Sequence, residues 1–388
     1  MNDTDNPPFS GRDDLLIKIR AQLANTPQEP LVVIGRKAIG KTTFLYRLAE
    51  TAPATTIPIF FSLGSMTIDD ESHFWVMTSQ YILEGIEQYG LSVPDVPIDE
   101  SARDWFMNGF LPAIIKVLRQ RHLLLVWDDA HRLMTETLPN DLFIQLDALC
   151  SVTIQMVFGI DIAHEDQLRQ FMPFITTSHQ LRLGNLSRLG CEVILRHHQP
   201  SIGNEMIDSI YTATGGLPIL IGRYTDELGT HPDIKALNHA IYAKSGDDFL
   251  RIWTSRTPDE QLVLTAIADL FYDDPLRPIT TTTIASWSAK SDYLLDETAI
   301  NAASRGLLYD EIILMANNQI TVNGELFRKW LLENARISGA KSADVTKIPV
   351  QMIILTIIIV GVVLVIILSL IGNVSDGGNI IPTVTPLP

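Results

Sequence analysis

The sequence predicts an α/β fold, with a mainly parallel sheet in a three-layer arrangement, and one helix that spans a membrane. Three observations support this architecture. Short apolar runs typical of strands alternate with helical patterns over the first half of the 388 residues. A glycine-rich loop joins the first strand to a helix. A long apolar run lies near the C-terminus.

The composition is that of a folded chain, with 46% hydrophobic and 19% charged residues. The formal net charge of −16 argues against a protein that coats nucleic-acid phosphates non-specifically. Cys150 and Cys191 are the two cysteines, and they provide neither a disulfide framework nor the spacing of zinc ligands. This usage fits a reducing compartment.

The first strand is expected at residues 31–34, and residues 35–43 follow it with the pattern G-x-x-x-x-G-K-[ST] before a helix. In such a loop, backbone N–H groups turn inward around a phosphate, and the helix N-terminus adds positive charge. Lys41 would reach the β- and γ-phosphates, and Thr42 would offer its hydroxyl to Mg²⁺. The alternative is a plain glycine turn with a solvated lysine. The expected nucleotide-binding residues are Gly35, Arg36, Lys37, Ala38, Ile39, Gly40, Lys41, Thr42 and Thr43.

A second acidic strand end should complete this site. The apolar run 123–127 ends in Asp128 and Asp129. We expect Asp128 to hold Mg²⁺ through its hydration shell and Asp129 to orient or deprotonate the attacking water. Two adjacent acids could instead cap the next helix. Together with Lys41, they are the predicted catalytic residues.

The remaining strands of this core are expected at 56–63, 152–158 and 180–183, with helices near 72–89, 102–121 and 139–149 and a surface loop at 90–100. Such sheets bind ligands at the carboxyl ends of their strands, where both motifs fall.

The C-terminal run 350–371 has 22 residues and no charge. As a helix it would extend ~33 Å, enough to cross a hydrocarbon layer of ~30 Å; the alternative is a buried core element. Basic residues precede it, and Asp376 alone carries charge after it. This asymmetry predicts a single-pass protein with its N-terminal domains in the cytoplasm and its tail outside. No signal peptide is expected at the N-terminus.

Several motifs, taken in order, resemble the STAND class of signalling NTPases and related AAA ATPases. They are the segment Pro8–Arg12, the acidic strand 123–133, the pair 183–188 and Thr214–Pro218, and the later segments 249–253, 258–264, 305–308 and 322–331. The resemblance covers residues 8–335. It implies a nucleotide-binding domain, a helical domain and a winged-helix domain. The expected boundaries are 1–184, 185–232, 233–337, a linker at 338–349, the membrane helix 350–371 and a tail at 372–388.

The resemblance also implies roles for single residues. In relatives, the proline of the G-G-x-P motif packs on the adenosine, which here would be Pro218. Its other interpretation, a proline in the first turn of a helix after a glycine break, is compatible with this role. Arg12 is implied to lie near the base. The sequence has no N-K-x-D segment of the kind that recognises guanine, so ATP is the expected nucleotide.

The chain departs from its relatives after the fourth strand. Relatives often place Arg, Thr or Asn there to sense the γ-phosphate, whereas this sequence has Asp161. Its carboxylate would repel phosphate unless it acts through Mg²⁺, so ATP binding is better supported than rapid hydrolysis. No arginine finger is assigned, and Arg169, Arg182 and Arg188 are expected to be solvated.

The implied winged-helix domain is acidic, because residues 245–335 contain seven basic and fourteen acidic residues. A DNA-binding face should be basic, so nucleic acid is an unlikely partner. The pair His197-His198 is expected to be a polar helix end because no third metal ligand stands nearby.

These observations suggest a membrane-anchored ATPase that acts as a nucleotide-dependent signalling or defence switch, reset by ATP hydrolysis. Its expected partners are ATP or ADP with Mg²⁺, the membrane, further copies of itself and an unknown protein that supplies a sensor or effector. One alternative is a catalytically weak ATP-binding membrane adaptor. A less favoured one is a membrane-tethered DNA-binding regulator.

Overall fold

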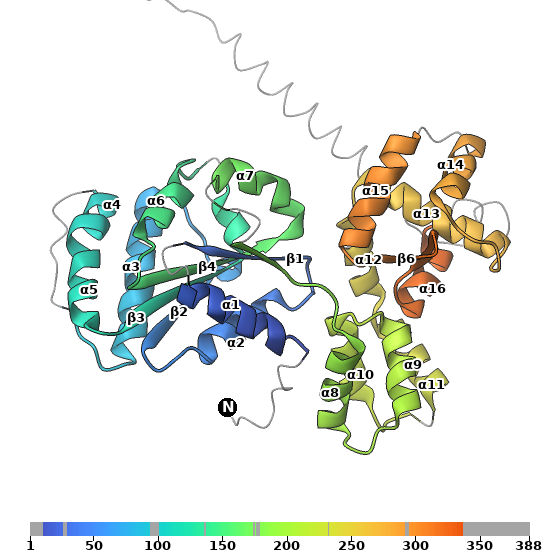
Figure 1. The fold of residues 1–388 in the computed structure, drawn as a ribbon, viewed down its shortest axis with the longest axis horizontal. Coiled ribbons are helices and arrows are strands. Elements are labelled where there is room, and N and C mark those ends of the chain that lie inside the picture. The colour runs from blue at the N-terminus through green and yellow to red at the C-terminus, as the bar shows by residue number, and fades with distance from the viewer. Residues whose placement is uncertain are drawn as a thin grey trace, which may run out of the picture.

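The computed structural model describes residues 11–336, apart from 26–28, 94–100, 136, 174, 176–178, 232 and 292–294. The chain forms an N-terminal lobe around a sheet and a mainly helical C-terminal lobe (Figure 1). The predicted membrane helix 350–371, its linker and the tail lie outside the described residues. Within the described part, no helix is both long and apolar enough to cross a membrane.

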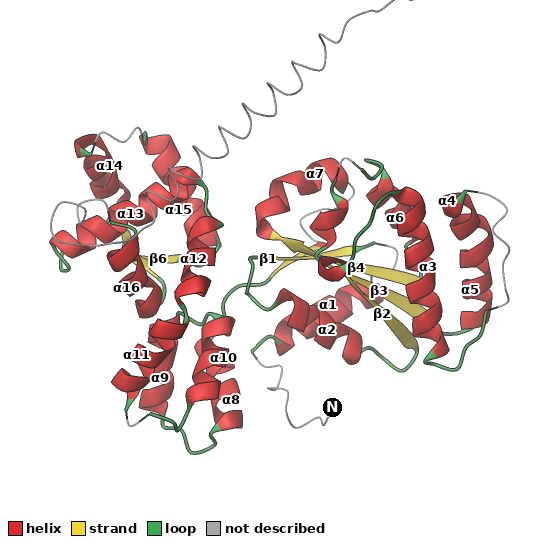
Figure 2. Ribbon diagram, turned by 180° about the vertical axis from the view of Figure 1, so that it is seen from behind, coloured by secondary structure: helices red, strands yellow, loops and turns green. Residues whose placement is uncertain are grey.

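The N-terminal lobe contains a five-stranded sheet in the order β2-β3-β4-β1-β5 (Figure 2). Every neighbouring pair is parallel, which confirms the predicted α/β class. The strands are β1 (Leu31–Gly35), β2 (Thr56–Ser62), β3 (His122–Asp128), β4 (Ile154–Asp161) and β5 (Gln180–Arg182). Parallel strands are covered on both faces, which explains their nearly continuous apolar runs.

Helices cover both faces of this sheet, giving three layers. Leu31 and Val33 of β1 belong to the apolar cluster under α1 and α2, whereas Val32 and Ile34 belong to the cluster under α3, α5 and α6. The alternation follows from the two-residue period of a strand. The helices and turns of this lobe are α1 (Asp13–Asn25), α2 (Lys41–Glu50), η1 (Leu63–Ser65), α3 (Glu71–Glu87), α4 (Ala102–Trp105), α5 (Leu111–Leu118), η3 (Ala130–Leu133), α6 (Leu142–Leu149), η4 (Ile162–Gln167) and α7 (Leu168–Phe171).

Two features differ from the sequence-based expectation. Helix α1 was not predicted, although its buried residues Leu16, Ile19 and Leu23 have helical spacing. The helix expected at 102–121 is interrupted by a π-helical segment, η2 (Phe106–Phe110), between α4 and α5. Pro112 stands in the first turn of α5, and a proline cannot donate the backbone hydrogen bond that would continue the preceding helix.

The C-terminal lobe has two parts. The helical part contains α8 (Arg188–His198), α9 (Asn204–Thr214), α10 (Pro218–Glu227) and α11 (Ile234–Lys244). The second part contains α12 (Gly246–Thr254), α13 (Pro258–Asp273), α14 (Thr281–Lys290), α15 (Glu297–Tyr309), the antiparallel hairpin β6 (Ile313–Ala316) and β7 (Gln319–Val322), and α16 (Glu325–Asn334). The predicted domain boundaries remain predictions.

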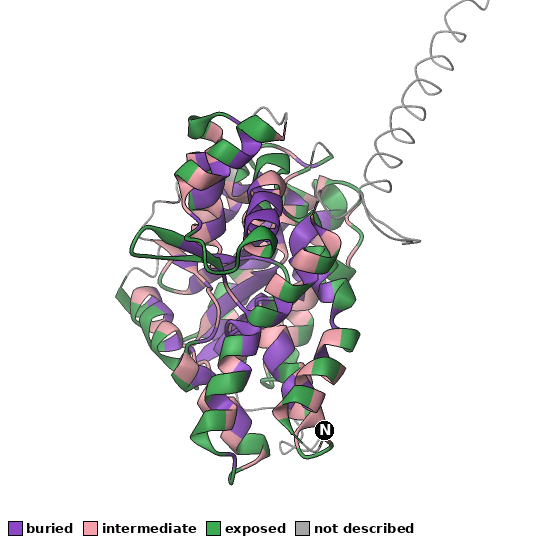
Figure 3. Cartoon of the chain, turned by 90° about the vertical axis from the view of Figure 1, so that its right-hand side faces the viewer, coloured by how far each residue is buried: buried purple, intermediate pink, exposed green. Residues whose placement is uncertain are grey.

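The lobes are in contact through the connection that follows β5. Leu183 and Leu186 on this connection are buried in an apolar cluster that continues from α1 and α2 into the helices of the C-terminal lobe. Figure 3 shows the buried residues of the chain in purple. Leu186 also donates its N–H to the carbonyl of Gly216, 2.8 Å away. The connection is therefore packed into the structure rather than a free linker.

Candidate nucleotide-binding site

Residues 35–43, from the end of β1 to the start of α2, have the turns that a phosphate-binding loop (P-loop) requires. Ala38 and Gly40 adopt left-handed conformations, with φ of 66° and 85°. Gly40 is the N-cap residue of α2. Because glycine has no side chain, its position leaves the first N–H groups of the helix open to an anion. Beneath the loop, the Ile39 side chain is buried in the apolar cluster.

Lys41 lies in the first turn of α2 and is 7% exposed. Its Nζ donates to the carbonyl oxygen of Gly35 at 3.0 Å. The same Nζ is 3.8 Å from Oδ2 of Asp161, at the end of β4. The loop lysine is thus held at the strand ends, and one of its partners is a carboxylate.

Thr42 and Asp128 face each other at the carboxyl end of β3. The Thr42 hydroxyl donates to Oδ2 of Asp128 at 2.7 Å. Burial is the main cause of a raised pKa for Asp128, and the hydrogen bond from Thr42 opposes it. Among the described residues, no group donates to Oδ1 of Asp128, which is also buried.

A buried carboxylate oxygen without a donor, beside a hydroxyl, suits Mg²⁺, which prefers oxygen ligands and keeps several waters. The residues present therefore fit the expected metal. In the described part of the chain, no three His, Cys, Asp or Glu side chains are arranged to hold a metal. The ion would depend on nucleotide phosphates and water in addition to Thr42 and Asp128.

Asp129 follows Asp128 in a left-handed conformation, with φ of 56°. It points toward Gly64, where an added Cβ atom would lie 2.8 Å from Oδ2 of Asp129. A glycine at position 64 therefore makes room for this carboxylate.

Lys41, Thr42 and Asp129 line a cavity of about 770 Å³, whereas the predicted residues Gly35, Ile39 and Asp128 are not among its lining residues. The cavity brings together most of the predicted residues, including Pro218 at the start of α10. It is lined by Arg36, Lys37, Ala38, Gly40, Lys41, Thr42, Thr43, Gly64, Asp129, His131, Arg132, Asp161, Pro218 and Ile219. Both lobes therefore contribute to its wall.

Arg12 is not among the residues that line this cavity. Its guanidinium donates to the carbonyl oxygens of Ile39 and Gly184, both at 2.7 Å. Burial lowers its pKa to about 10. Arg12 therefore links the P-loop to the connection between the lobes through hydrogen bonds. Its expected contact with the base of the nucleotide remains a prediction.

His131, for which no role was predicted from the sequence, lies on the cavity wall. Its ring stacks on His164, with 4.5 Å between ring centroids. Burial, and to a lesser degree His164, lower the pKa of His131. The sequence signal was its position two residues after Asp129, because a short turn after a strand keeps neighbouring side chains at the same sheet edge.

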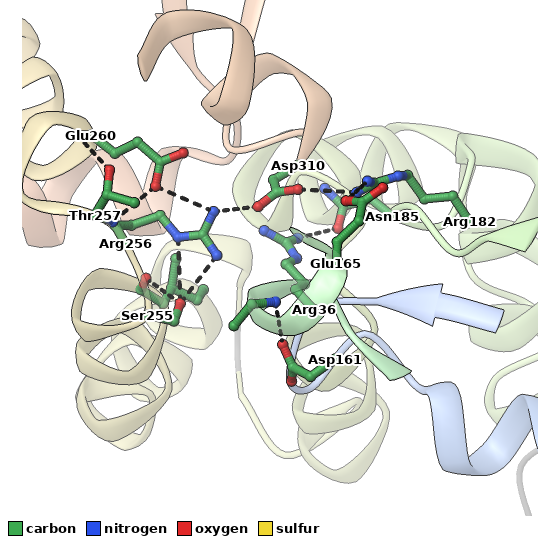
Figure 4. Close-up of polar contacts among 12 residues, drawn as sticks. Arg36, Asp161, Glu165, Arg182, Asn185, Ser255, Arg256, Thr257, Glu260 and Asp310 are labelled. Atoms are coloured by element: carbon green, nitrogen blue, oxygen red, sulfur yellow. Dashed lines mark hydrogen bonds and ion pairs between the residues drawn. The ribbon is translucent and has the colours of Figure 1, made fainter. Parts of the chain in front are cut away.

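A polar cluster also joins the lobes beside the P-loop (Figure 4). Asp310, after α15, is 3.3 Å from Arg182 at the end of β5 and also pairs with Arg256 of the C-terminal lobe. Arg36 of the P-loop donates to the side chain of Asn185. The backbone N–H of Asn185 in turn donates to the carboxylate of Glu311.

The expectation that Arg182 is solvated is wrong. Its side chain is 19% exposed and pairs with Glu165 as well as Asp310. Its guanidinium carbon also lies 3.2 Å from the centre of the Tyr309 ring. Arg188 is more exposed and pairs with Glu192 and Asp208.

Known structures resemble this fold. A Walker-type ATPase of Pyrococcus abyssi is 13% identical, with a TM-score of 0.61, over 85% of this chain and 97% of that one. Cdc6p from Pyrobaculum aerophilum is 16% identical, with a TM-score of 0.40, over 85% and 96%. A STAND protein with a tetratricopeptide repeat sensor from Pyrococcus horikoshii is 14% identical, with a TM-score of 0.35, over 84% and 42%.

The chain matches none of the family models and none of the curated proteins with which it was compared. The similarity to the Walker-type ATPase establishes the fold: this chain has the fold of the P-loop ATPases.

Proposed function

We propose that this chain is a membrane-anchored, STAND-like ATP-binding switch that ATP hydrolysis resets. The observation that carries the proposal is the composition of the cavity wall, which contains residues of the P-loop together with Pro218 and Ile219 of α10. A nucleotide in this cavity would contact both lobes. Its binding would therefore favour the arrangement of the lobes that it fits best.

The residue roles follow the sequence prediction. When bound, ATP would supply the phosphoryl group that is transferred to water, and Mg²⁺ would supply positive charge beside the phosphates. The backbone N–H groups of residues 40–43 and the Lys41 ammonium would bind the phosphates. Thr42 and Asp128 would hold Mg²⁺, and Asp129 would orient the attacking water. Pro218 would pack on the adenosine of the nucleotide.

Full-length protein in detergent micelles provides the test of this site. We expect Lys41→Ala to abolish ATP binding, measured by equilibrium dialysis. Lys18→Ala removes an exposed lysine from α1 and should leave binding unchanged. Unchanged ATP binding by Lys41→Ala would refute the proposed site. If binding depends on Lys41 but wild type releases no phosphate, the adaptor alternative replaces the hydrolytic switch.

The switch part of the proposal is supported by the polar cluster around Asp310, which joins the second part of the C-terminal lobe, the proposed winged-helix domain, to residues beside the P-loop. We expect the arrangement of the lobes to control self-association. The assay is the mass of the micelle-bound protein with ADP and with a non-hydrolysable ATP analogue. An identical mass in both would refute nucleotide-dependent assembly. A separate protein would supply the sensor or effector.

Membrane attachment is proposed from the uncharged run 350–371. Arginine placed within such a run is costly in hydrocarbon. We therefore expect the double variant Ile358→Arg and Val363→Arg to leave the membrane fraction, whereas Ile358→Leu and Val363→Leu should remain in it. Retention of the arginine variant would refute the anchor. The proposed orientation, with the N-terminal domains in the cytoplasm, predicts that only the tail is accessible from outside.

The alternative of a DNA-binding regulator is favoured by the resemblance to a winged helix and opposed by the net charge of −7 in residues 245–335. We expect no salt-sensitive retention of the full-length protein on immobilised duplex DNA. Such retention would replace the proposed role of this part as an intramolecular switch element.

A further inference from the structure

Asp161 occupies a distinctive position in the cavity. It ends β4 directly beside the P-loop, because it pairs in register with Gly35 of β1. One carboxylate oxygen, Oδ1, accepts from the backbone N–H of Ala163 at 3.1 Å. The other, Oδ2, is 3.8 Å from Nζ of Lys41. The side chain therefore caps the turn η4 and pairs with the loop lysine at the same time.

The charges around this pair are unbalanced. Besides Asp161, the carboxylates of Asp128 and Asp129 lie at the same strand ends. The other buried cation of the loop, Arg36, donates to Asn185 and is directed toward the carboxylates of the C-terminal lobe (Figure 4). Lys41 therefore already has a carboxylate counterion, Asp161, at the place where it would meet a phosphate.

We infer that Asp161 is an internal competitor for Lys41, which nucleotide phosphates must displace or share with a divalent cation. This inference rests on the proposed binding of ATP. A metal-free triphosphate brings negative charge to an ammonium that already has a counterion, and it also approaches that counterion. A divalent cation offsets this repulsion. Asp161 would thereby make nucleotide binding strongly dependent on Mg²⁺.

The capping role of Asp161 can be separated from its charge. Asparagine caps helical turns about as well as aspartate, and serine also caps them. Asp161→Asn therefore removes the charge and keeps an acceptor for the N–H of Ala163. Asp161→Ser is a second uncharged variant that retains a cap. Asp70 caps α3 in the same lobe through the N–H of His73, so Asp70→Asn is a control with the same loss of charge.

The experiment is equilibrium dialysis of ATP with full-length protein in detergent micelles, with Mg²⁺ or with EDTA. In EDTA, we expect Asp161→Asn to bind ATP at least about tenfold more tightly than wild type, equivalent to about 1.4 kcal/mol. The gain should be smaller with Mg²⁺, so the ratio of the two affinities should fall. Asp161→Ser should repeat both effects, and Asp70→Asn should show neither.

The outcomes separate this inference from the proposed function. If Lys41→Ala abolishes binding but both Asp161 variants match wild type with and without Mg²⁺, the inference is wrong and the nucleotide site stands. The inference is equally wrong if these variants bind ATP more weakly in EDTA. If Lys41→Ala binds ATP normally, the proposed site itself fails. Melting temperatures of the Asp161 variants near that of wild type show that the turn remains capped.

Discussion

Asp310→Asn tests whether the polar cluster couples the lobes. Asp310 links Arg182 of the N-terminal lobe to Arg256 of the C-terminal lobe. The side chains of Asp310 and Arg256 are 8% and 4% exposed. Asparagine has nearly the same shape as aspartate and keeps one acceptor oxygen. The substitution therefore removes the charge without creating a cavity.

The loss of free energy depends on which carboxylates still pair with Arg182 and Arg256 in the variant. Removing one partner of a buried ion pair costs about 3–5 kcal/mol, because the other charge remains buried. Arg256 keeps Glu260, at 3.9 Å, and Arg182 keeps Glu165. Arg256 and Asp310 both belong to the C-terminal lobe, so the pair of Arg182 with Asp310, whose side chains are 19% and 8% exposed, is the one that crosses the interface. We therefore expect a smaller change, about 1.5 kcal/mol, in the free energy of opening the interface. Amides protected by this interface should then exchange about tenfold faster.

Two amides report on the opening directly. The N–H of Asn185 donates to the carboxylate of Glu311, and the N–H of Leu186 donates to the carbonyl of Gly216. Hydrogen exchange of a peptide that contains both amides, measured by mass spectrometry, gives the ratio of rates.

The control is Glu325→Gln, which removes an exposed carboxylate 3.4 Å from Arg328. An exposed pair contributes about 0–1 kcal/mol, so this variant should exchange nearly as wild type. If Asp310→Asn exchanges no faster than Glu325→Gln, the cluster does not hold the lobes together.

Three further predictions concern single sites. Gly216→Ala should lower the melting temperature by several degrees, at about 2–4 °C per kcal/mol, because φ is +76° and the new Cβ would lie 2.2 Å from a backbone oxygen; Gly203→Ala, in open space, should not. Burial raises the pKa of both Cys150 and Cys191 to about 12, so iodoacetamide should modify the native protein at pH 8 far more slowly than the unfolded protein. Because burial disfavours the ionised form of Asp128, Asp128→Asn should melt higher than wild type in EDTA, and a lower melting temperature would contradict this assignment.

The sheet and the P-loop could be predicted because local patterns define them. Strands buried on both faces are continuous apolar runs, and the loop has fixed glycine and lysine positions. Helix α1 had an equally local pattern in Leu16, Ile19 and Leu23, so it could have been found. The interruption before α5 depends on Pro112, whose effect on the preceding turn was also readable.

The polar contacts could not be predicted, because they join residues far apart in the sequence. An arginine with no recognisable partner nearby in the sequence is expected to be solvated, as Arg182 was. The fold places Asp310, 128 positions later, beside it. Similarly, Asp161 was recognised as unfavourable for phosphate, but its pairing with Lys41 depends on the register of β4 against β1.

Acidic side chains of the C-terminal lobe act on Arg36 at this interface. Arg36 lines the cavity, and the carboxylates of Asp310 and Glu311 oppose the fall in its pKa that burial causes. A phosphate in the cavity would compete with these carboxylates for the same guanidinium. Coupling between binding and docking is reciprocal, because both belong to one thermodynamic cycle. If ATP loosens the docked lobes, Asp310→Asn, which weakens docking, should tighten ATP binding, at most by the factor by which docking weakens it. Unchanged affinity in equilibrium dialysis would show that Arg36 does not connect the two.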